Sequence, residues 1–142
     1  MLVDTNVVVF AINQLSPHHL HAQQFLQKNK KELLLAHQNV MEAIRVLTYP
    51  KFTFPMTTRN AYEAVMSIVA SLRVVSTNME TYHAALALLK KYKLTSDRIF
   101  DMYLVATMIS NGISTIATEN ERDFVLYKEI RVINPFRLGN GH

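Results

Sequence analysis

The sequence predicts an α/β domain of three layers, in which helices cover both faces of a central, mostly parallel sheet. Short apolar segments rich in β-branched residues alternate along the chain with longer segments whose apolar residues recur at helical spacing. The chain has 142 residues, which suits one domain, and only three glycines and four prolines interrupt its regular elements. We therefore expect a single domain at residues 1–136 and a disordered tail at residues 137–142.

The opening run from Leu2 to Phe10 is apolar on both faces, which is typical of a parallel strand buried on both sides. Asp4 interrupts the run early, so the strand proper can instead end there, with a helix following at once. The strands expected after this run lie at 33–36, 73–76, 115–118 and 131–133. Helices are expected between them: one begun by Ser16-Pro17, one from Asn39 to Pro50, one at 59–72, one capped by Thr77 or Asn78 that runs to Leu94, and one from Ser96 or Asp97 to Asn111-Gly112. A helical turn is expected at 121–127.

Composition narrows the classes of function. The 15 Lys and Arg outnumber the 11 Asp and Glu, so the formal charge is +4, which slightly favours a polyanionic partner. The absence of cysteine excludes disulfides, thiolate metal sites and thiol nucleophiles. The start of the chain has no basic segment, and Asp4 breaks its apolar run, so we predict neither a signal peptide nor a membrane span and expect a soluble, cytoplasmic protein.

Two acids lie close to the ends of predicted strands. Asp4 falls inside a run that otherwise has the pattern of a buried strand, and a buried carboxylate must be paired, protonated or bound to a metal. An Asp at this point can also simply cap a helix. Glu42 lies one turn into the helix that follows the second strand, where Asn39 as cap and Glu42 at the third helical position would form a capping box.

Four further acidic or amide residues lie at the start of a predicted helix or just after a predicted strand. Asp97 and Asp101 are four residues apart, on one face of a helix, and Asp101 adjoins the apolar stripe whereas Asp97 suits a cap. Asn120 and Asp123 come after the strand at 115–118, where each alone could be a cap or a first-turn acid. Taken together, oxygen ligands without cysteine or paired histidine point to a hard cation, Mg²⁺ or Mn²⁺. Such ions activate water and stabilise charge on a phosphoryl group, and a basic chain suits a phosphodiester substrate.

Four segments occur in order at a spacing that resembles the PIN-domain ribonucleases, and among them the VapC-like toxins of toxin–antitoxin pairs. They are MLVDTNV at the start, NVMEAIRVLT at 39–48, IFDMYLVAT at 99–107 and IATENERDF at 116–124. The resemblance covers residues 2–136. It implies a PIN-like fold and an endoribonuclease that depends on Mg²⁺ or Mn²⁺.

The resemblance also assigns roles to residues. The three acids of the family match Asp4, Glu42 and Asp101, which would hold the cation. Asn6 matches a polar residue of the family's active site, and Asn6 and Thr118 would orient a water or a phosphate oxygen.

One position departs from the family pattern. Asn120 stands where the fourth acid is expected. Either Asp123 or Asp97 replaces that acid, or Asn120 holds the attacking water as a neutral group, and we therefore expect one ion rather than two. Arg45 could contact the substrate or pair with Glu42, and the sequence favours neither.

A segment rich in aromatic residues begins at the end of the helix expected from Asn39 to Pro50. Aromatic and basic side chains are interleaved there, as on surfaces that stack RNA bases: Tyr49, Lys51, Phe52, Phe54, Arg59 and Tyr62. The same residues could clamp a segment of an antitoxin or simply pack a loop.

The leading hypothesis is a toxin with an RNA substrate, a cognate antitoxin partner and a homodimeric state, the last two on resemblance alone. The alternative is a catalytically weak PIN-like module that binds RNA or protein, which the missing fourth acid favours and the three intact acids oppose. A receiver-like signalling domain would need paired acids ahead of the first strand, and the only early acid here is Asp4.

Overall fold

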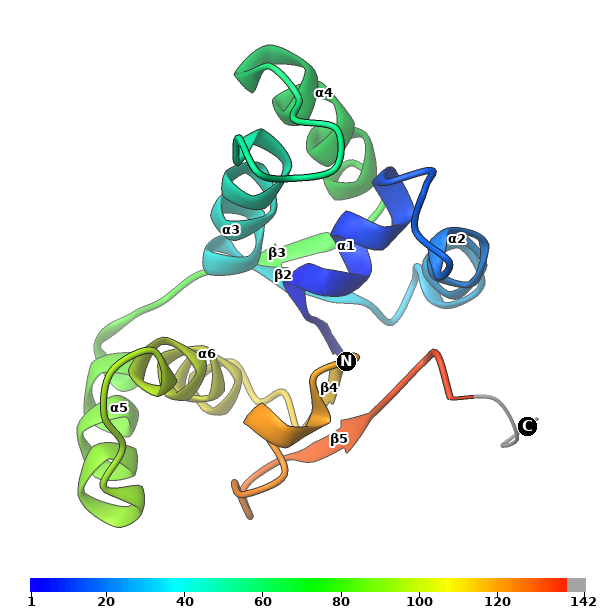
Figure 1. The fold of residues 1–142 in the computed structure, drawn as a ribbon. Coiled ribbons are helices and arrows are strands. Elements are labelled where there is room, and N and C mark those ends of the chain that lie inside the picture. Colours follow the sequence, from blue (N-terminus) through cyan, green and yellow to red (C-terminus); the bar gives the residue numbers. More distant parts are fainter. Residues whose placement is uncertain (138–142) are drawn as a thin grey trace.

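The central sheet has five parallel strands in the order β3-β2-β1-β4-β5 (Figure 1). The computed structural model describes residues 1–137. The strands are β1 (Leu2–Val3), β2 (Leu34–Ala36), β3 (Arg73–Val75), β4 (Thr115–Ala117) and β5 (Arg131–Ile133). The helices are α1 (Thr5–Ile12), α2 (His19–Asn29), α3 (His37–Thr48), α4 (Thr58–Val69), α5 (Met79–Tyr92), α6 (Arg98–Ser110) and the 3-10 turn η1 (Glu121–Asp123). Across residues 1–137, every helix is too short or too polar to cross a lipid bilayer.

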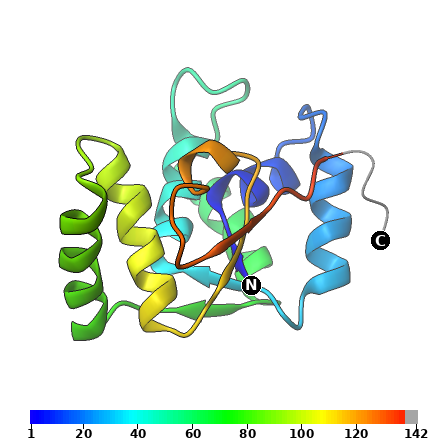
Figure 2. The same cartoon turned by 90° about the horizontal axis from the view of Figure 1, so that it is seen from below.

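Helices cover both faces of the sheet. Successive side chains of a strand point to opposite faces, so Val3 packs with α1 to α4 whereas Leu2 packs with α5 and α6. Figures 1 and 2 show α5 and α6 together on one side of the strands and α1 to α4 on the other. The predicted three-layer α/β fold with a parallel sheet is confirmed.

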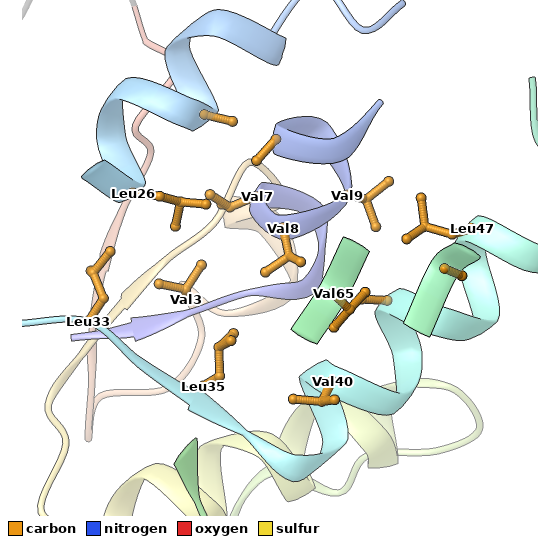
Figure 3. Close-up of a cluster of buried hydrophobic side chains, with 14 of the residues drawn as sticks. Val3, Val7, Val8, Val9, Leu26, Leu33, Leu35, Val40, Leu47 and Val65 are labelled. Carbon is orange, nitrogen blue, oxygen red and sulfur yellow. The ribbon is translucent and has the colours of Figure 1, made fainter. Parts of the chain in front are cut away.

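The opening apolar run forms a strand and then a helix. β1 ends at Val3, Asp4 is the N-cap, and α1 begins at Thr5, so the strand does not extend to Phe10. Helix α1 contacts α2, α3 and α4, which surround it, and Figure 3 shows Val7 and Val8 inside the resulting cluster. A helix buried on nearly every side has no polar face, so its sequence looks like that of a buried strand.

Three helix boundaries differ from the expected ones. The Ser16 hydroxyl and carbonyl accept hydrogen bonds from the amides of His18 and His19, at 3.1 Å each, so this segment forms a turn and α2 begins at His19. Helix α5 ends at Tyr92 because Lys93 adopts a left-handed conformation, with φ of 51°. The helical turn expected at 121–127 is limited to η1.

Helix α3 starts two residues earlier than expected. Ala36 is its N-cap, and Asn39 lies at the third helical position, where its Oδ1 accepts a hydrogen bond from the Ala36 amide at 3.2 Å. Asn39 therefore performs the capping that the sequence interpretation assigned jointly to Asn39 and Glu42. The capping-box interpretation of Glu42 is wrong, and its carboxylate is available for another role.

The chain beyond β5 returns to the body of the domain. Arg137, the first residue of the predicted tail, places Nη2 2.9 Å from Glu121 Oε2. Residues 138–142, the rest of that tail, lie outside the described residues.

Candidate functional site

A cleft of about 350 Å³ opens at the edge of the sheet where β1, β2 and β4 end. We call it the acidic cleft, and its lining residues are Asp4, Thr5, Asn6, Val9, Phe10, Glu42, Arg45, Val46, Phe52, Asp101, Asn120 and Asp123. The fold therefore gathers the predicted site residues from four separate segments of the chain. Thr118 is fully buried and reaches this site through a hydrogen bond to Asp4.

Asp4 is held in place by three donors. Its Oδ1 accepts from the Thr5 amide at 2.8 Å, and its Oδ2 accepts from the Thr118 hydroxyl at 2.7 Å and from the Asn6 amide group at 3.2 Å. The residue is only 7% exposed, and this burial raises the pKa of its carboxyl. The nearby charges of Glu42 and Asp123 raise it further, against the lowering effect of the hydrogen bonds.

Both carboxylate oxygens of Glu42 accept hydrogen bonds that fix its position. The Thr5 hydroxyl donates to Oε2 at 2.9 Å, and the Gln38 amide donates to Oε1 at 3.0 Å. The same Gln38 nitrogen also donates to the carbonyl of Phe100, on α6, at 3.0 Å. Buried Asn39 in turn donates to the Thr5 hydroxyl at 3.2 Å, so one chain of hydrogen bonds joins α1 to α3 beneath the cleft.

Asp101 lies on α6, half-buried. Burial raises the pKa of its carboxyl to about 7, and the negative charges of Asp123 and Asp4 add to the shift. Glu42 acts in the same direction, whereas the positive charge of Arg98 opposes it. These mutual effects show that the four carboxylates share one electrostatic environment.

The polar residues after β4 connect to the same network. Asn6 donates to the Thr118 hydroxyl at 3.0 Å and accepts from the Glu119 amide at 3.1 Å, so α1 is tied to the end of β4. The Asn120 amide donates to the Thr118 hydroxyl at 3.0 Å, and its side chain lines the cleft.

The structure separates the alternatives for the missing fourth acid. Asp123 and Asn120 both line the acidic cleft, whereas Asp97 is exposed and lies outside it. Asp97 is the N-cap residue of α6, although its side chain makes no capping hydrogen bond. Arg45 also lines the cleft, and within residues 1–137 it forms no ion pair with Glu42.

Two residues that position a predicted acid could not be predicted from the sequence. Thr5 and Gln38 both position Glu42, and only their locations near the predicted acids could have suggested this. Tyr127 is buried, and within residues 1–137 its hydroxyl has no hydrogen-bond partner. Burial and the negative charge of Asp101 raise the pKa of Tyr127 to about 12, and its ring packs in the core cluster against Tyr92 rather than in the lining of the cleft.

Comparison with known proteins identifies the fold family. The sequence model of the PIN domain matches residues 1–129, which is most of the chain. The chain belongs to the PIN domain family. The PIN-like fold expected from the four sequence segments is thereby confirmed. No curated protein sequence matches the chain significantly.

Solved structures support the same PIN fold. A toxin–antitoxin complex from Klebsiella pneumoniae is similar, with a TM-score of 0.69 at 17% identity over 96% of this chain and 98% of that chain. FitAcB from Neisseria gonorrhoeae gives a TM-score of 0.72 at 18% identity over 96% and 99% of the two chains. VapC20 from Mycobacterium tuberculosis is described as a toxin that cleaves the sarcin–ricin loop. It gives a TM-score of 0.67 at 17% identity over 92% of this chain and 98% of that chain. At these identities the likeness shows a shared fold.

The residues of this PIN domain fit a hard divalent cation. Within residues 1–137, none of the four cleft carboxylates forms an ion pair with a basic side chain, so their negative charge is not neutralised by the protein. All candidate ligands are oxygens. Within the same residues, no three Asp, Glu or His side chains already converge tightly enough to ligate one ion directly. Mg²⁺ commonly keeps several waters and takes one or two carboxylates, which suits this open arrangement.

Divalent cations should stabilise the PIN domain more at high pH than at low pH. Because the folded protein keeps the Asp101 proton up to about pH 7 and the unfolded chain releases it near 3.8, the folded state binds more protons in between. The contribution of Asp101 to the free energy of unfolding therefore falls as pH rises from about 4 to about 7. We expect Asp101→Asn to melt higher than the parent near pH 8 in EDTA, and Mg²⁺ to raise the parent's melting temperature there.

Thermal melts in EDTA and in Mg²⁺ at about pH 5 and about pH 8 test this expectation. Near pH 5 the difference between parent and Asp101→Asn should be smaller than near pH 8, because the loss of stability builds up gradually between the unfolded pKa near 3.8 and the folded pKa of about 7. A parent that melts higher than Asp101→Asn in EDTA at about pH 8 would contradict the repulsion inferred here.

Thr5→Val should destabilise the domain and loosen Glu42. The substitution keeps the shape of the side chain but removes the hydroxyl that bridges Asn39 and Glu42, which leaves a buried donor on Asn39 without its acceptor. We expect the free energy of unfolding to fall by about 1–3 kcal/mol in urea titrations. Thr5→Ser retains the hydroxyl and serves as the matched control, so equal stability of the two variants would contradict this role.

Proposed function

We propose that this protein is a metal-dependent endoribonuclease that acts as the toxin of a toxin–antitoxin pair. The observation that carries the proposal is the acidic cleft, which Asp4, Glu42, Asp101 and Asp123 line without forming an ion pair to a basic side chain within residues 1–137. Uncompensated carboxylates that raise one another's pKa favour binding of a cation. A cleft of this kind in a PIN domain with positive net charge suits a phosphodiester substrate.

Asp4, Glu42 and Asp101 would hold Mg²⁺ or Mn²⁺, some of them through water. When bound, such an ion activates water and stabilises charge on a phosphoryl group. The protein's own part is to fix the ligands, and the donors on Asp4 and the pair of hydrogen bonds to Glu42 do this. Rigid placement of ligands by surrounding hydrogen bonds is what a precise cation site requires.

The reaction would be hydrolysis of one phosphodiester bond. The oxygen of water bonds to phosphorus, one ester P–O bond breaks, and the products are a phosphomonoester and a hydroxyl. Asp123, which lines the cleft and is not assigned to the cation, would accept the proton that the water loses, and a proton from solvent would complete the leaving hydroxyl. Asn6 and Asn120 would orient the water or a phosphate oxygen by hydrogen bonds, and Thr118 supports both from behind.

The biological role rests on fold similarity. The similar structures include a toxin–antitoxin complex from Klebsiella pneumoniae and a toxin that cleaves the sarcin–ricin loop. By that likeness we propose a cognate antitoxin as partner, a homodimer as the toxin's own state and the cytoplasm as its location. The one clear departure, Asn120 in place of a fourth acid, favours the alternative of a catalytically weak module that binds RNA or protein.

RNA cleavage by the purified protein tests the proposed function. A panel of structured and single-stranded RNAs is incubated with Mg²⁺, Mn²⁺ or EDTA. Internal cleavage that requires the cation supports the nuclease. Binding of RNA without cleavage of any member in any cation favours the weak-module alternative.

A further inference from the structure

A second cavity, of about 340 Å³, lies beside the acidic cleft. We call it the aromatic pocket. Its apolar lining comes from the end of α1, from α3 and from the loop that joins α3 to α4: Ile12, Leu15, Leu47, Phe52, Phe54 and Met56. Two amide side chains, Asn13 and Gln14, complete it, and no lining residue is charged. In Figure 2 the loop after α1 and the loop after α3 rise on the same side of the molecule.

The aromatic pocket adjoins the acidic cleft. Phe52 lines both cavities. Helix α1 spans the distance between them, because Asp4 caps its first turn in the cleft and Ile12 ends it in the pocket. Eight helical residues rise about 12 Å, so the two sites are close enough to hold neighbouring parts of one strand.

The chemistry of the pocket matches an unpaired base. Aromatic faces such as those of Phe52 and Phe54 stack on bases of any sequence. The amide groups of Asn13 and Gln14 each carry donors and an acceptor, which suit the polar edge of a base. Phe54 is 64% exposed and Leu15 is 58% exposed, so the pocket presents apolar surface that a ring could cover.

We propose that the aromatic pocket takes one unpaired nucleobase of the RNA strand whose phosphate lies in the acidic cleft. This inference rests on the proposed function and extends it, because it makes the substrate single-stranded next to the cleaved bond. Base stacking on Phe54 would then set where along a strand the phosphate reaches the cleft.

The surroundings favour RNA over a protein segment as the occupant. The pocket lies next to the cleft that would hold the phosphate, and Phe52 forms part of the wall of both. Arg45 in the cleft and Lys51 beside Phe52 supply positive charge near a strand that enters both sites.

Phe54→Ala is the decisive variant. Phe52 packs against the core and its loss could disturb folding, whereas Phe54 is largely exposed and lies outside the core clusters. Binding of a labelled single-stranded RNA is measured by fluorescence anisotropy in the Asp4→Asn protein, so that cleavage does not interfere. Phe54→Ala should weaken binding about 5- to 100-fold, the effect of losing one stacked base, and Phe54→Trp should restore it.

Two controls isolate the stacking contact. Tyr82→Ala removes an exposed aromatic ring from α5, in the other helical layer, and should leave RNA affinity unchanged. A strand of abasic ribose phosphates offers no base to the pocket, so it should bind equally to the protein with Phe54 and to the Phe54→Ala variant. Circular dichroism confirms that each variant is folded.

The outcomes separate this inference from the proposed function. If the parent cleaves RNA and Phe54→Ala binds and cleaves as the parent does, the pocket proposal fails and the nuclease stands. If the parent cleaves nothing but RNA binding still depends on Phe54 and on bases, the proposed chemistry fails and the pocket stands. If Phe54→Ala weakens capture of the antitoxin but not of RNA, the pocket belongs to a protein partner and the proposal is overturned.

Discussion

Asp4→Asn should remove nearly all metal-dependent RNA cleavage and leave the domain folded. A cation contributes several kcal/mol of transition-state stabilisation, so loss of a main ligand should lower kcat/KM by about 10²- to 10⁴-fold. Asn keeps one side-chain oxygen that can accept from the Thr5 amide, and it fills the same volume. Because burial and neighbouring acids raise the pKa of Asp4, removal of its charge should offset the loss of the oxygen that accepts from Thr118 and Asn6, so the cation-free domain should stay folded.

The matched control is Asp97→Asn. Asp97 is exposed, lies outside the acidic cleft and makes no capping hydrogen bond, so its replacement should change cleavage less than about twofold. Single-turnover cleavage of one defined RNA measures both variants. Equal activity of Asp4→Asn and the parent would show that Asp4 is a helix cap and nothing more.

Leu35→Ala should produce a large loss of stability. Leu35 is fully buried in the middle of β2 and packs in the cluster that joins the sheet to α1 and α3, as Figure 3 shows. Removing a buried Leu side chain leaves a cavity and typically lowers the free energy of unfolding by about 2–5 kcal/mol. Leu20→Ala, at a side chain that is 69% exposed, should change it by less than about 0.5 kcal/mol.

Urea titrations of the two Leu variants test this prediction. The effect should extend to function, because β2 leads directly into α3, which carries Asn39 and Glu42. If Leu35→Ala unfolds at the same urea concentration as Leu20→Ala, the packing beneath the acidic cleft is not what holds β2 in place.

The fold could be predicted from alternating apolar segments, with one instructive error. Leu2 to Phe10 contains a two-residue strand and a helix, and both are buried so fully that the sequence shows no polar face at which to divide them. The acid at position 4 was the only local signal of the boundary, since a carboxylate commonly caps a helix. Local turn geometry likewise decided the start of α2 at His19, and no propensity rule foresees it.

The site could be predicted only in part. Asp4, Glu42 and Asp101 were recognisable because charged groups stood beside apolar patterns, and the structure lines one cleft with them. Thr5 and Gln38 were not recognisable, because a Thr or Gln near a helix start has no distinctive pattern until the contacting helix is known. Side-chain partners contributed by distant segments depend on the tertiary fold rather than on local spacing.

Position in the fold sets aside one of the candidates for the role of the missing fourth acid. From the sequence, Asp97 or Asp123 could replace the missing acid, or Asn120 could hold the attacking water as a neutral group. The structure brings Asp123 to the cleft and leaves Asp97 outside it, because α6 presents Asp101 to the cleft and its N-cap residue to solvent.

Titration of the purified protein with Mn²⁺ tests the central claim most directly, with bound ion counted by electron paramagnetic resonance and RNA cleavage followed in the same samples. We predict about one ion bound per chain, a cleavage rate that rises with occupancy of that site, and loss of both in Asp4→Asn. Cleavage that persists in EDTA, or full Mn²⁺ binding by Asp4→Asn, would contradict a catalytic cation held by the carboxylates of the acidic cleft.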